Sequence, residues 1–386
     1  MLFTRSFLVT LLALLLLAAS FASGYVVHDR INASDSFPIF NQAYKILANH
    51  GLKEIPDGPS LEYGMIRGML QAYDEPYTTF IEPAQHELES DSLNGSFGGI
   101  GVQLGNDSEG YWLLYPFPDG PASTAGILEG DRLLAVENMQ VSPATPLETI
   151  QSAIRGPVGK HVALTIGRPP DFAPVKIAIR RSEIPLPSVT WHLAAGEPRV
   201  GILEINLITA STAEEIQRAV KDLQERDAAY FVMDLRDNPG GLLSAGVEIA
   251  RLFLQEGVII EQQYRGQPVE VFRVERPGPL IDIPLAVVIN QGSASAAEII
   301  AGTLKAHRRA MLVGHPTFGK DTIQLVFDLS DGSSLHVTAA HWWIPGLVPP
   351  LSGNGLQPDI NISGQVEGAG PDAALQAAIR MLLETN

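Results

Sequence analysis

The stretch PLAVVINQGSASAAEIIAGTLKAH, residues 284–307, joins an apolar run to a turn of small residues and then to a helical pattern. A continuous apolar run is typical of a strand buried on both faces of a sheet. AYFVMDLRDNPGG, residues 229–241, repeats the strand and glycine turn, and AMLVGHPTFGK, residues 310–320, contains a further strand. We therefore predict a mainly parallel α/β sheet covered on both faces, with the three turns at its carboxyl edge, where ligand sites of such sheets lie.

The first of these turns carries a candidate nucleophile, Ser295. It precedes a predicted helix, and a helix N-terminus favours the negative charge that develops on the tetrahedral intermediate of acyl transfer. Serine is also a preferred N-cap residue, so Ser293 and Ser295 are also explained as helix caps. Taken alone, this turn favours the capping role.

A serine nucleophile needs a base, and the surrounding sequence offers no standard one. Ser295 is not part of a GxSxG motif, and His307 lies further along the predicted helix beside two arginines, where we expect solvent. A base from a distant histidine stays open, because triad members can be far apart in sequence. Lys320 remains, provided that burial or nearby positive charge lowers its pKa from about 10.4. An exposed lysine after a glycine turn is the commoner situation.

The DNPGG turn, residues 237–241, is the third component. Its glycines permit a backbone N–H to face outward as an oxyanion donor. Ordinary turn chemistry explains the same residues equally well.

Residues 97–170 predict a small α+β module. GDRLLAVENMQV, residues 130–141, indicates two strands around a tight turn, and PLETIQSAIRG, residues 146–156, indicates an amphipathic helix. HVALTIGRP, residues 161–169, indicates a final strand.

This module resembles a PDZ domain, through GGIGV at residues 98–102 and the segments that follow it. In that family an extended peptide adds as a strand beside the sheet, and loop amides hold its terminal carboxylate. The resemblance assigns that role to the amides of Ile100, Gly101 and Val102. Considered alone, the glycine cluster is equally typical of a tight hairpin.

The N-terminal part consists of an apolar segment followed by helices. Phe7–Val27 is uniformly apolar, so residues 1–30 are expected to be a signal peptide or a retained membrane anchor, and either would export the rest. A buried core helix is the weaker explanation, because the segment has no polar face. Residues 36–95 predict a helical region broken by turns.

Composition excludes several classes of function. The formal net charge of −17 leaves no basic stripe for a phosphate backbone, so we expect no nucleic acid partner. There is no cysteine, and the nine histidines show no HExxH or HxH spacing that would indicate a metal hydrolase. Nothing in the sequence requires a metal or an organic cofactor.

Three motifs taken together resemble the C-terminal processing peptidases, or tail-specific proteases, which are exported serine peptidases. They are DLRDNPGG, GSASAAEI and GHPTFGKDTIQ, and a late GLQPDI also agrees. The resemblance covers nearly everything after residue 36 and assigns residues 171–386 to an α/β peptidase core. It implies that Ser295 is the nucleophile and that Lys320, 25 positions later (320 − 295), is the base.

The same resemblance implies three supporting roles. Gln324 would orient the lysine amine, and the amides of Gly241 and Ala296 would form the oxyanion hole. A carboxylate in place of Gln324 would favour the ammonium form and impair the base. Without the resemblance, Gln324 would be taken for an ordinary polar strand residue.

The sequence departs from the family pattern at several positions. His315 stands where a glutamate is common, Ala297 replaces a frequent serine, and WWIPGL replaces an aromatic pair followed by TPSG. These departures concern substrate contacts and the charge around Lys320. A protonated His315 would depress the lysine pKa further, although an ordinary surface histidine is the simpler explanation.

The expected function is that of an exported serine endopeptidase that recognises nonpolar C-terminal tails through the PDZ domain. Its expected partners are protein or peptide substrates, the membrane if residues 1–30 are retained, and a second copy if the chain forms a homo-oligomer. The alternatives are a non-cleaving PDZ-containing binding or chaperone protein, and a hydrolase that uses a distant histidine.

Overall fold

The computed structural model describes residues 37–56, 58–351, 353–362 and 372–385. The chain divides into two compact units, Met1–Asp74 and Glu75–Asn386. The described part of the first unit forms helices α2 (Pro38–His50) and α3 (Pro59–Tyr73), and none of their side chains is buried.

The apolar segment Phe7–Val27 lies outside the described residues. Among the residues that are described, no helix has the length and apolarity needed to span a bilayer. The choice between signal peptide and anchor therefore stays a prediction.

The second unit contains a six-stranded sheet that matches the predicted mainly parallel sheet. Its strand order is β10-β11-β12-β15-β16-β19, and every neighbouring pair is parallel except β10 with β11. The strands are β10 (Val189–Ala194), β11 (Glu197–Ile205), β12 (Tyr230–Asp234), β15 (Leu285–Ile289), β16 (Met311–Gly314) and β19 (Ile360–Asn361).

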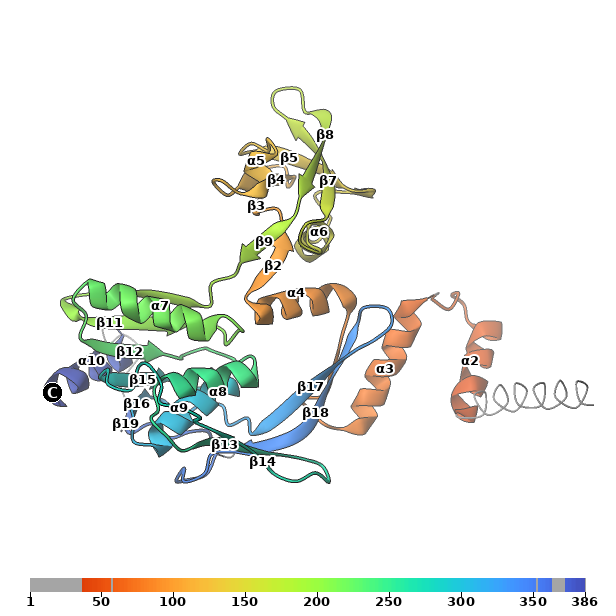
Figure 1. Cartoon of the computed structure of the whole chain (residues 1–386). Coiled ribbons are helices and arrows are strands. Elements are labelled where there is room, and N and C mark those ends of the chain that lie inside the picture. Colours follow the sequence, from red (N-terminus) through yellow and green to blue (C-terminus); the bar gives the residue numbers. More distant parts are fainter. Residues whose placement is uncertain (1–36, 57, 352, 363–371, 386) are drawn as a thin grey trace, which may run out of the picture. The chain divides into compact units, whose positions relative to one another are not determined.

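Helices cover both faces of this sheet, as predicted (Figure 1). Because side chains alternate along a strand, Val287 packs in one core and Val288 in the opposite core. The first core also receives α7, α8 and α9, and the second receives α10. These helices are α7 (Thr212–Glu225), α8 (Leu243–Leu252), α9 (Ala296–Ala306) and α10 (Ala373–Thr385).

A second, antiparallel sheet packs in the same core as α8 and α9 and was not predicted. Strand β18 is its centre: it pairs with β1, β13 and β17, and β14 extends β13. Trp342 on β18 is only 2% exposed and packs in the same core as α9. The strands are β1 (Thr79–Ile81), β13 (Val258–Tyr264), β14 (Glu270–Arg273), β17 (Thr322–Asp328) and β18 (Ser334–Trp343).

The predicted α+β module has its own sheet, in the order β3-β4-β5-β7-β8, and its own core. The two strands around a tight turn within residues 130–141 and the helix within residues 146–156 are confirmed, and the turn lies at Glu137-Asn138. The prediction that residues 161–169 form the last strand is wrong, because β8 pairs with β7 along its whole length. The elements are β3 (Val102–Asn106), β4 (Trp112–Pro116), α5 (Pro121–Thr124), β5 (Asp131–Val136), β6 (Met139–Gln140), α6 (Leu147–Ile154), β7 (His161–Arg168) and β8 (Ala173–Arg180).

Two short segments connect this module to the rest of the unit. Strands β2 (Ser96–Gly99) and β9 (Ser182–Pro185) pair with each other where the chain enters and leaves the module. Helix α4 (Pro83–Asn94) precedes β2 and contacts α6. The predicted domain boundaries themselves stay predictions.

Candidate active site

The three predicted turns meet at the carboxyl edge of the parallel sheet. They follow β12, β15 and β16, which are neighbours and run in the same direction. The N–H of Ala294 donates to the carbonyl of Asn238 at 2.9 Å, and the N–H of Phe318 donates to the carbonyl of Ser293 at 3.0 Å. The turns are therefore hydrogen-bonded to one another.

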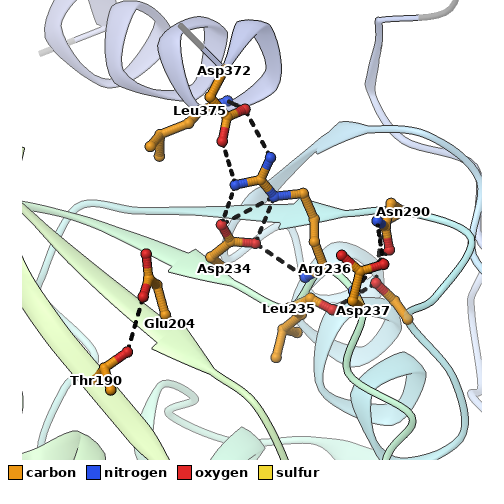
Figure 2. Close-up of polar contacts among 10 residues, drawn as sticks. Thr190, Glu204, Asp234, Leu235, Arg236, Asp237, Asn290, Asp372 and Leu375 are labelled. Carbon is orange, nitrogen blue, oxygen red and sulfur yellow. Dashed lines mark hydrogen bonds and ion pairs between the residues drawn. The ribbon is translucent and has the colours of Figure 1, made fainter.

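Side chains lock the first two turns together. The N–H of Asp237 donates to Asn290 Oδ1 at 2.9 Å, and Asn290 Nδ2 donates back to Asp237 Oδ1 at 2.9 Å (Figure 2). The hydroxyl of Ser293 donates to the carbonyl of Leu235 at 2.7 Å and accepts the N–H of Asn290. Because Ser293 is fully buried, its hydroxyl serves the architecture of the turn.

Arg236 braces the start of the DNPGG turn, a role that the sequence pattern did not reveal. Its Nε donates to Asp234 Oδ1 at 2.9 Å and its Nη1 to Asp372 Oδ1 at 2.7 Å (Figure 2). The hydrogen bond to Asp234, and then that to Asp372, raise the pKa of Arg236 against the effect of burial. Since Asp372 directly precedes α10, the C-terminal helix is tied to this turn.

Ser295 occupies the N-cap of α9 with unusual backbone geometry. Its φ of 54° and ψ of −117° lie in a region of backbone conformation that residues other than glycine rarely adopt. Such a conformation costs about 1–3 kcal/mol and is concentrated at functional sites. The capping role and the nucleophile role weighed above thus fall on the same position.

The glycines of the DNPGG turn permit its close approach to Ser295. A Cβ on Gly240 would lie 2.9 Å from Ser295 Cβ and 2.8 Å from the carbonyl oxygen of Ala294. The carbonyl of Gly240 accepts the N–H of Ile208 at 2.8 Å. In a trans peptide the next N–H points the opposite way, so the amide of Gly241 is directed away from Ile208.

Ala296, the other predicted oxyanion donor, is the first residue of α9. The N–H groups of a first helical turn have no partner within their own helix. The unusual φ and ψ of Ser295 set the orientation of the peptide group between Ser295 and Ala296. This geometry leaves a backbone donor beside the serine side chain, where an oxyanion hole requires one.

Lys320 and Gln324 are in direct contact. Lys320 Nζ donates to Gln324 Oε1 at 2.7 Å, and Gln324 Nε2 donates to the carbonyl of Tyr77. Because a carbonyl can only accept, Tyr77 fixes the amide so that its oxygen faces the lysine. The Tyr77 ring also lies 5.0 Å from Lys320 Nζ, measured to the ring centroid.

The surroundings of Lys320 lower the pKa of its amine. Burial lowers the pKa of Lys320, and the negative charges of Glu75 and Glu298 oppose this without reversing it. The lysine is half-buried, so it is not the exposed residue of the simpler explanation. A lowered pKa is what a lysine base requires.

Glu298, which we had not singled out, connects the serine turn to the lysine turn. Its Oε2 accepts the backbone N–H of Ser295 at 2.8 Å and that of Lys320 at 3.0 Å, while Oε1 accepts the N–H of Gly319 at 2.7 Å and the hydroxyl of Thr317. The carboxylate is fully buried, which raises its pKa, and these four hydrogen bonds oppose the rise. In the sequence, only the Ser-x-x-Glu spacing of a capping box indicates a role for Glu298.

The histidines take different positions. His315 is exposed, whereas His307 is partly buried and its Nε2 lies 2.7 Å from the carbonyl of Val258, so the expectation of solvent around it is wrong. His336 lies opposite Val326, two residues from the Gln324–Thr338 pair, and therefore on the same face as Gln324. Burial lowers the pKa of His336, and the charges of His86 and Lys320 add to this against Glu89.

The predicted peptide loop leads into an exposed sheet edge. Ile100 is buried, Gly101 has a φ of 67°, and Val102 begins β3, which is the edge strand of its sheet. A groove of about 280 Å³ lies between β3 and α6. Its lining is mainly apolar and consists of Phe97, Val102, Gln103, Leu104, Phe117, Leu147, Gln151, Ile154 and Arg155.

Comparisons with known proteins identify the family. Residues 199–362 match Peptidase family S41, and residues 116–168 match the PDZ domain. The chain is 36% identical over 331 residues to a carboxyl-terminal-processing protease of Picosynechococcus sp., covering 83% of this chain and 79% of that protein. This chain belongs to the carboxyl-terminal processing protease family.

The chain is also similar to other processing proteases. A carboxy-terminal-processing protease of Bartonella bacilliformis is 35% identical over 312 residues, covering 79% of this chain and 70% of the relative. A solved photosystem II D1 C-terminal processing protease is 28% identical, with a TM-score of 0.47, and the match covers 88% of this chain and 90% of that structure. The two matching family models and the curated relatives confirm the family resemblance, the serine-type peptidase class and the fold class with its PDZ domain and peptidase core.

Proposed function

We propose that this processing protease hydrolyses peptide bonds with Ser295 as nucleophile and Lys320 as general base. The observation that carries the proposal is the pair of hydrogen bonds that Glu298 Oε2 accepts from the backbones of both residues. A single buried oxygen thereby joins the turn that carries a strained serine to the turn that carries a lysine of lowered pKa.

In the acylation step, Ser295 Oγ attacks the substrate carbonyl carbon while its proton passes to neutral Lys320 Nζ. One N–H of the amine donates to Gln324 Oε1, which leaves the lone pair available for the serine proton. The backbone N–H groups of Gly241 and Ala296 stabilise the oxyanion. Collapse of the intermediate breaks the C–N bond, and the lysine ammonium returns the proton to the leaving amine.

Deacylation repeats the same proton transfers with water. Neutral Lys320 takes a proton from the water that attacks the acyl-serine, and then returns it to Ser295 Oγ as the ester bond breaks. The chain's own groups balance every proton in this cycle. Neither a metal nor an organic cofactor takes part in it.

The PDZ domain supplies the recognition of substrate tails in this proposal. The groove between β3 and α6 combines apolar side chains with a free sheet edge, which suits strand addition by an extended nonpolar peptide. The amides of Ile100, Gly101 and Val102 would hold the terminal carboxylate. Substrates are accordingly proteins or peptides with nonpolar C-termini.

Helix α4 connects the PDZ domain to the peptidase core, so peptide binding to the PDZ domain could open access to Ser295 through this helix. Its Asp91 accepts from Arg155 Nη1 at 3.1 Å, and its Glu87 accepts from the hydroxyl of Ser152 at 2.8 Å. Arg155 also stacks on Phe97 in the peptide groove. A peptide in the groove therefore contacts the same arginine that holds α4.

Export of the peptidase belongs to the same proposal. The uniform apolarity of Phe7–Val27 supports a signal peptide or an anchor, and an anchored form would work at the membrane surface. Homo-oligomer formation stays open. The proposed boundaries are 1–30 for the leader, 36–95 for the helical region, 97–170 for the PDZ domain and 171–386 for the core.

The test uses a loosely folded protein with or without a nonpolar C-terminal tail. Wild type should cleave the tailed form faster, and Ser295→Ala should cleave neither. Deletion of residues 100–181, which removes the module together with β8 and keeps the β2–β9 pair, should abolish the difference between the two. Equal cleavage of both forms by wild type and by the deletion variant would contradict tail recognition. Tail binding without cleavage by wild type would favour a binding protein, and full activity in Lys320→Ala would favour a histidine base.

A further inference from the structure

An open cavity lies between α4 and the DNPGG turn. Its volume is about 590 Å³, and the residues around it come from three separate segments of the chain. The lining consists of Gln85, Leu88, Glu89, Ser92 and Leu93 of α4, together with Leu207 and Pro239–Gly241.

This cavity adjoins the reacting centre. Gly240 forms part of its wall, and a Cβ on that residue would lie 2.9 Å from Ser295 Cβ. Gly241, whose amide is the proposed oxyanion donor, forms the neighbouring part of the wall. A substrate carbonyl held between Ser295 and that amide would place a flanking side chain at the cavity mouth.

The chemistry of the lining defines what the cavity would take. Leu88 and Leu93 from the helix, Leu207 and the ring of Pro239 present apolar groups from both sides. Glu89 is part of the same wall and would repel an acidic side chain. The lining therefore favours an aliphatic side chain and disfavours a carboxylate.

We propose that this cavity is a substrate subsite for an aliphatic side chain of a residue adjoining the scissile bond. The inference rests on the proposed role of Ser295 and adds a specificity determinant to it. Apolar pockets discriminate by roughly 10- to 200-fold for each missing methylene group, and excluding a desolvated carboxylate adds to that preference.

The test measures kcat/KM of the full-length chain on two series of peptides with one tail. One series carries leucine, alanine or glutamate immediately before the scissile bond, and the other carries them immediately after it. In one of the two series, wild type should prefer leucine to glutamate by at least about tenfold. Leu88→Lys should lose most of that preference by accepting glutamate.

Matched controls keep the outcome clear. Ser90→Lys places the same charge on an exposed position of α4 that does not line the cavity, and should retain the wild-type preference. Leu207→Lys tests the opposite wall if Leu88→Lys does not fold. Cleavage by wild type with no preference in either series would overturn the subsite, as would a preference unchanged in both lysine variants of the lining. Failure of wild type to cleave any peptide would instead contradict the proposed function.

Discussion

The proposed nucleophile and the proposed base are held in two different ways. Ser295 lies in a turn at the edge of the parallel sheet, where backbone hydrogen bonds among three turns and a strained φ of 54° fix its position. Lys320 leads into the antiparallel sheet, and its amine is held through side chains, with Gln324 as partner and Tyr77 behind it. Ser295 is thus positioned by backbone geometry and Lys320 by side-chain contacts, so substitutions should affect them differently.

The largest effect on activity should come from Ser295→Ala, compared with the substitution of Ser293 in the same turn. Ser295→Ala should abolish peptide hydrolysis, a loss of about 10⁶-fold in kcat for a nucleophile of this type. Its cost in stability should not exceed that of a lost N-cap, about 0.5–2 kcal/mol. Ser293→Ala removes a buried hydroxyl with two hydrogen bonds, and should lower the free energy of unfolding by about 1–3 kcal/mol. Peptidase assays and urea denaturation measure both. Equal catalytic losses in the two variants would contradict the assignment of the nucleophile.

Lys320→Met should lower activity by about 10²- to 10⁴-fold and yet stabilise the fold. The pKa of Lys320 is lowered in the folded state, so below the unfolded pKa of about 10.4 the unfolded chain holds that proton more tightly. Lys320→Met removes the free-energy cost of burying the charged amine. Its stabilising effect should therefore vanish above the unfolded pKa of about 10.4.

Lys305 provides the matched control for the base. Its ammonium donates to the carbonyl of Gln357 at 2.7 Å and pairs with Asp359 at 2.8 Å. Lys305→Met should therefore destabilise the protein without a specific loss of catalysis. Thermal unfolding at several pH values would show the two opposite signs, and a destabilised Lys320→Met would contradict burial as the main influence on that lysine.

Gln324→Glu should shift the pH dependence of kcat. A carboxylate beside Lys320 Nζ favours the ammonium, so the alkaline rise in activity should move to higher pH. Each unit of upward shift removes about tenfold of the neutral lysine at neutral pH. Gln324→Met serves as the control, because it removes the hydrogen bond without adding charge. An unmoved profile in the glutamate variant would mean that this side chain does not orient the base.

The smallest effect should come from the brace behind the DNPGG turn. Arg236→Lys loses the fork of hydrogen bonds to Asp234 and Asp372, and should cost about 1–3 kcal/mol of stability with a several-fold loss of kcat. Glu204→Gln, which disturbs only the exposed contact with Thr190 on the same sheet, should change stability by less than about 0.5 kcal/mol (Figure 2). Equal effects would show that the brace has no special role.

Sequence patterns revealed the parts of the fold that depend on local order. The run at Val287–Ile289 indicated a buried strand and the glycines at 240 and 241 a turn, and the structure contains both. The antiparallel sheet was missed because its long strand β18 pairs with segments as distant as β1, which no local pattern reveals. Tyr77 was missed for the same reason, since it acts through a backbone carbonyl.

The candidate site shows the same division. Motif spacing pointed to Ser295, Lys320 and Gln324, whereas Arg236 and Glu298 were not singled out. Arg236 reaches Asp372, more than a hundred residues away, and its contact depends on the packing of α10. Glu298 could have been found from its capping spacing, but its link to the turn of Lys320 requires the assembled sheet.

The most direct measurement is the rate at which a fluorophosphonate labels the serine across pH, in wild type and in Lys320→Met. Intact mass and peptide mapping would locate the adduct. Labelling is expected at Ser295, with a rate that rises as Lys320 loses its proton at a pH below about 10.4, and the rise should be lost in the variant. Labelling at another residue, or the same pH dependence in both proteins, would contradict Lys320 as the base for Ser295.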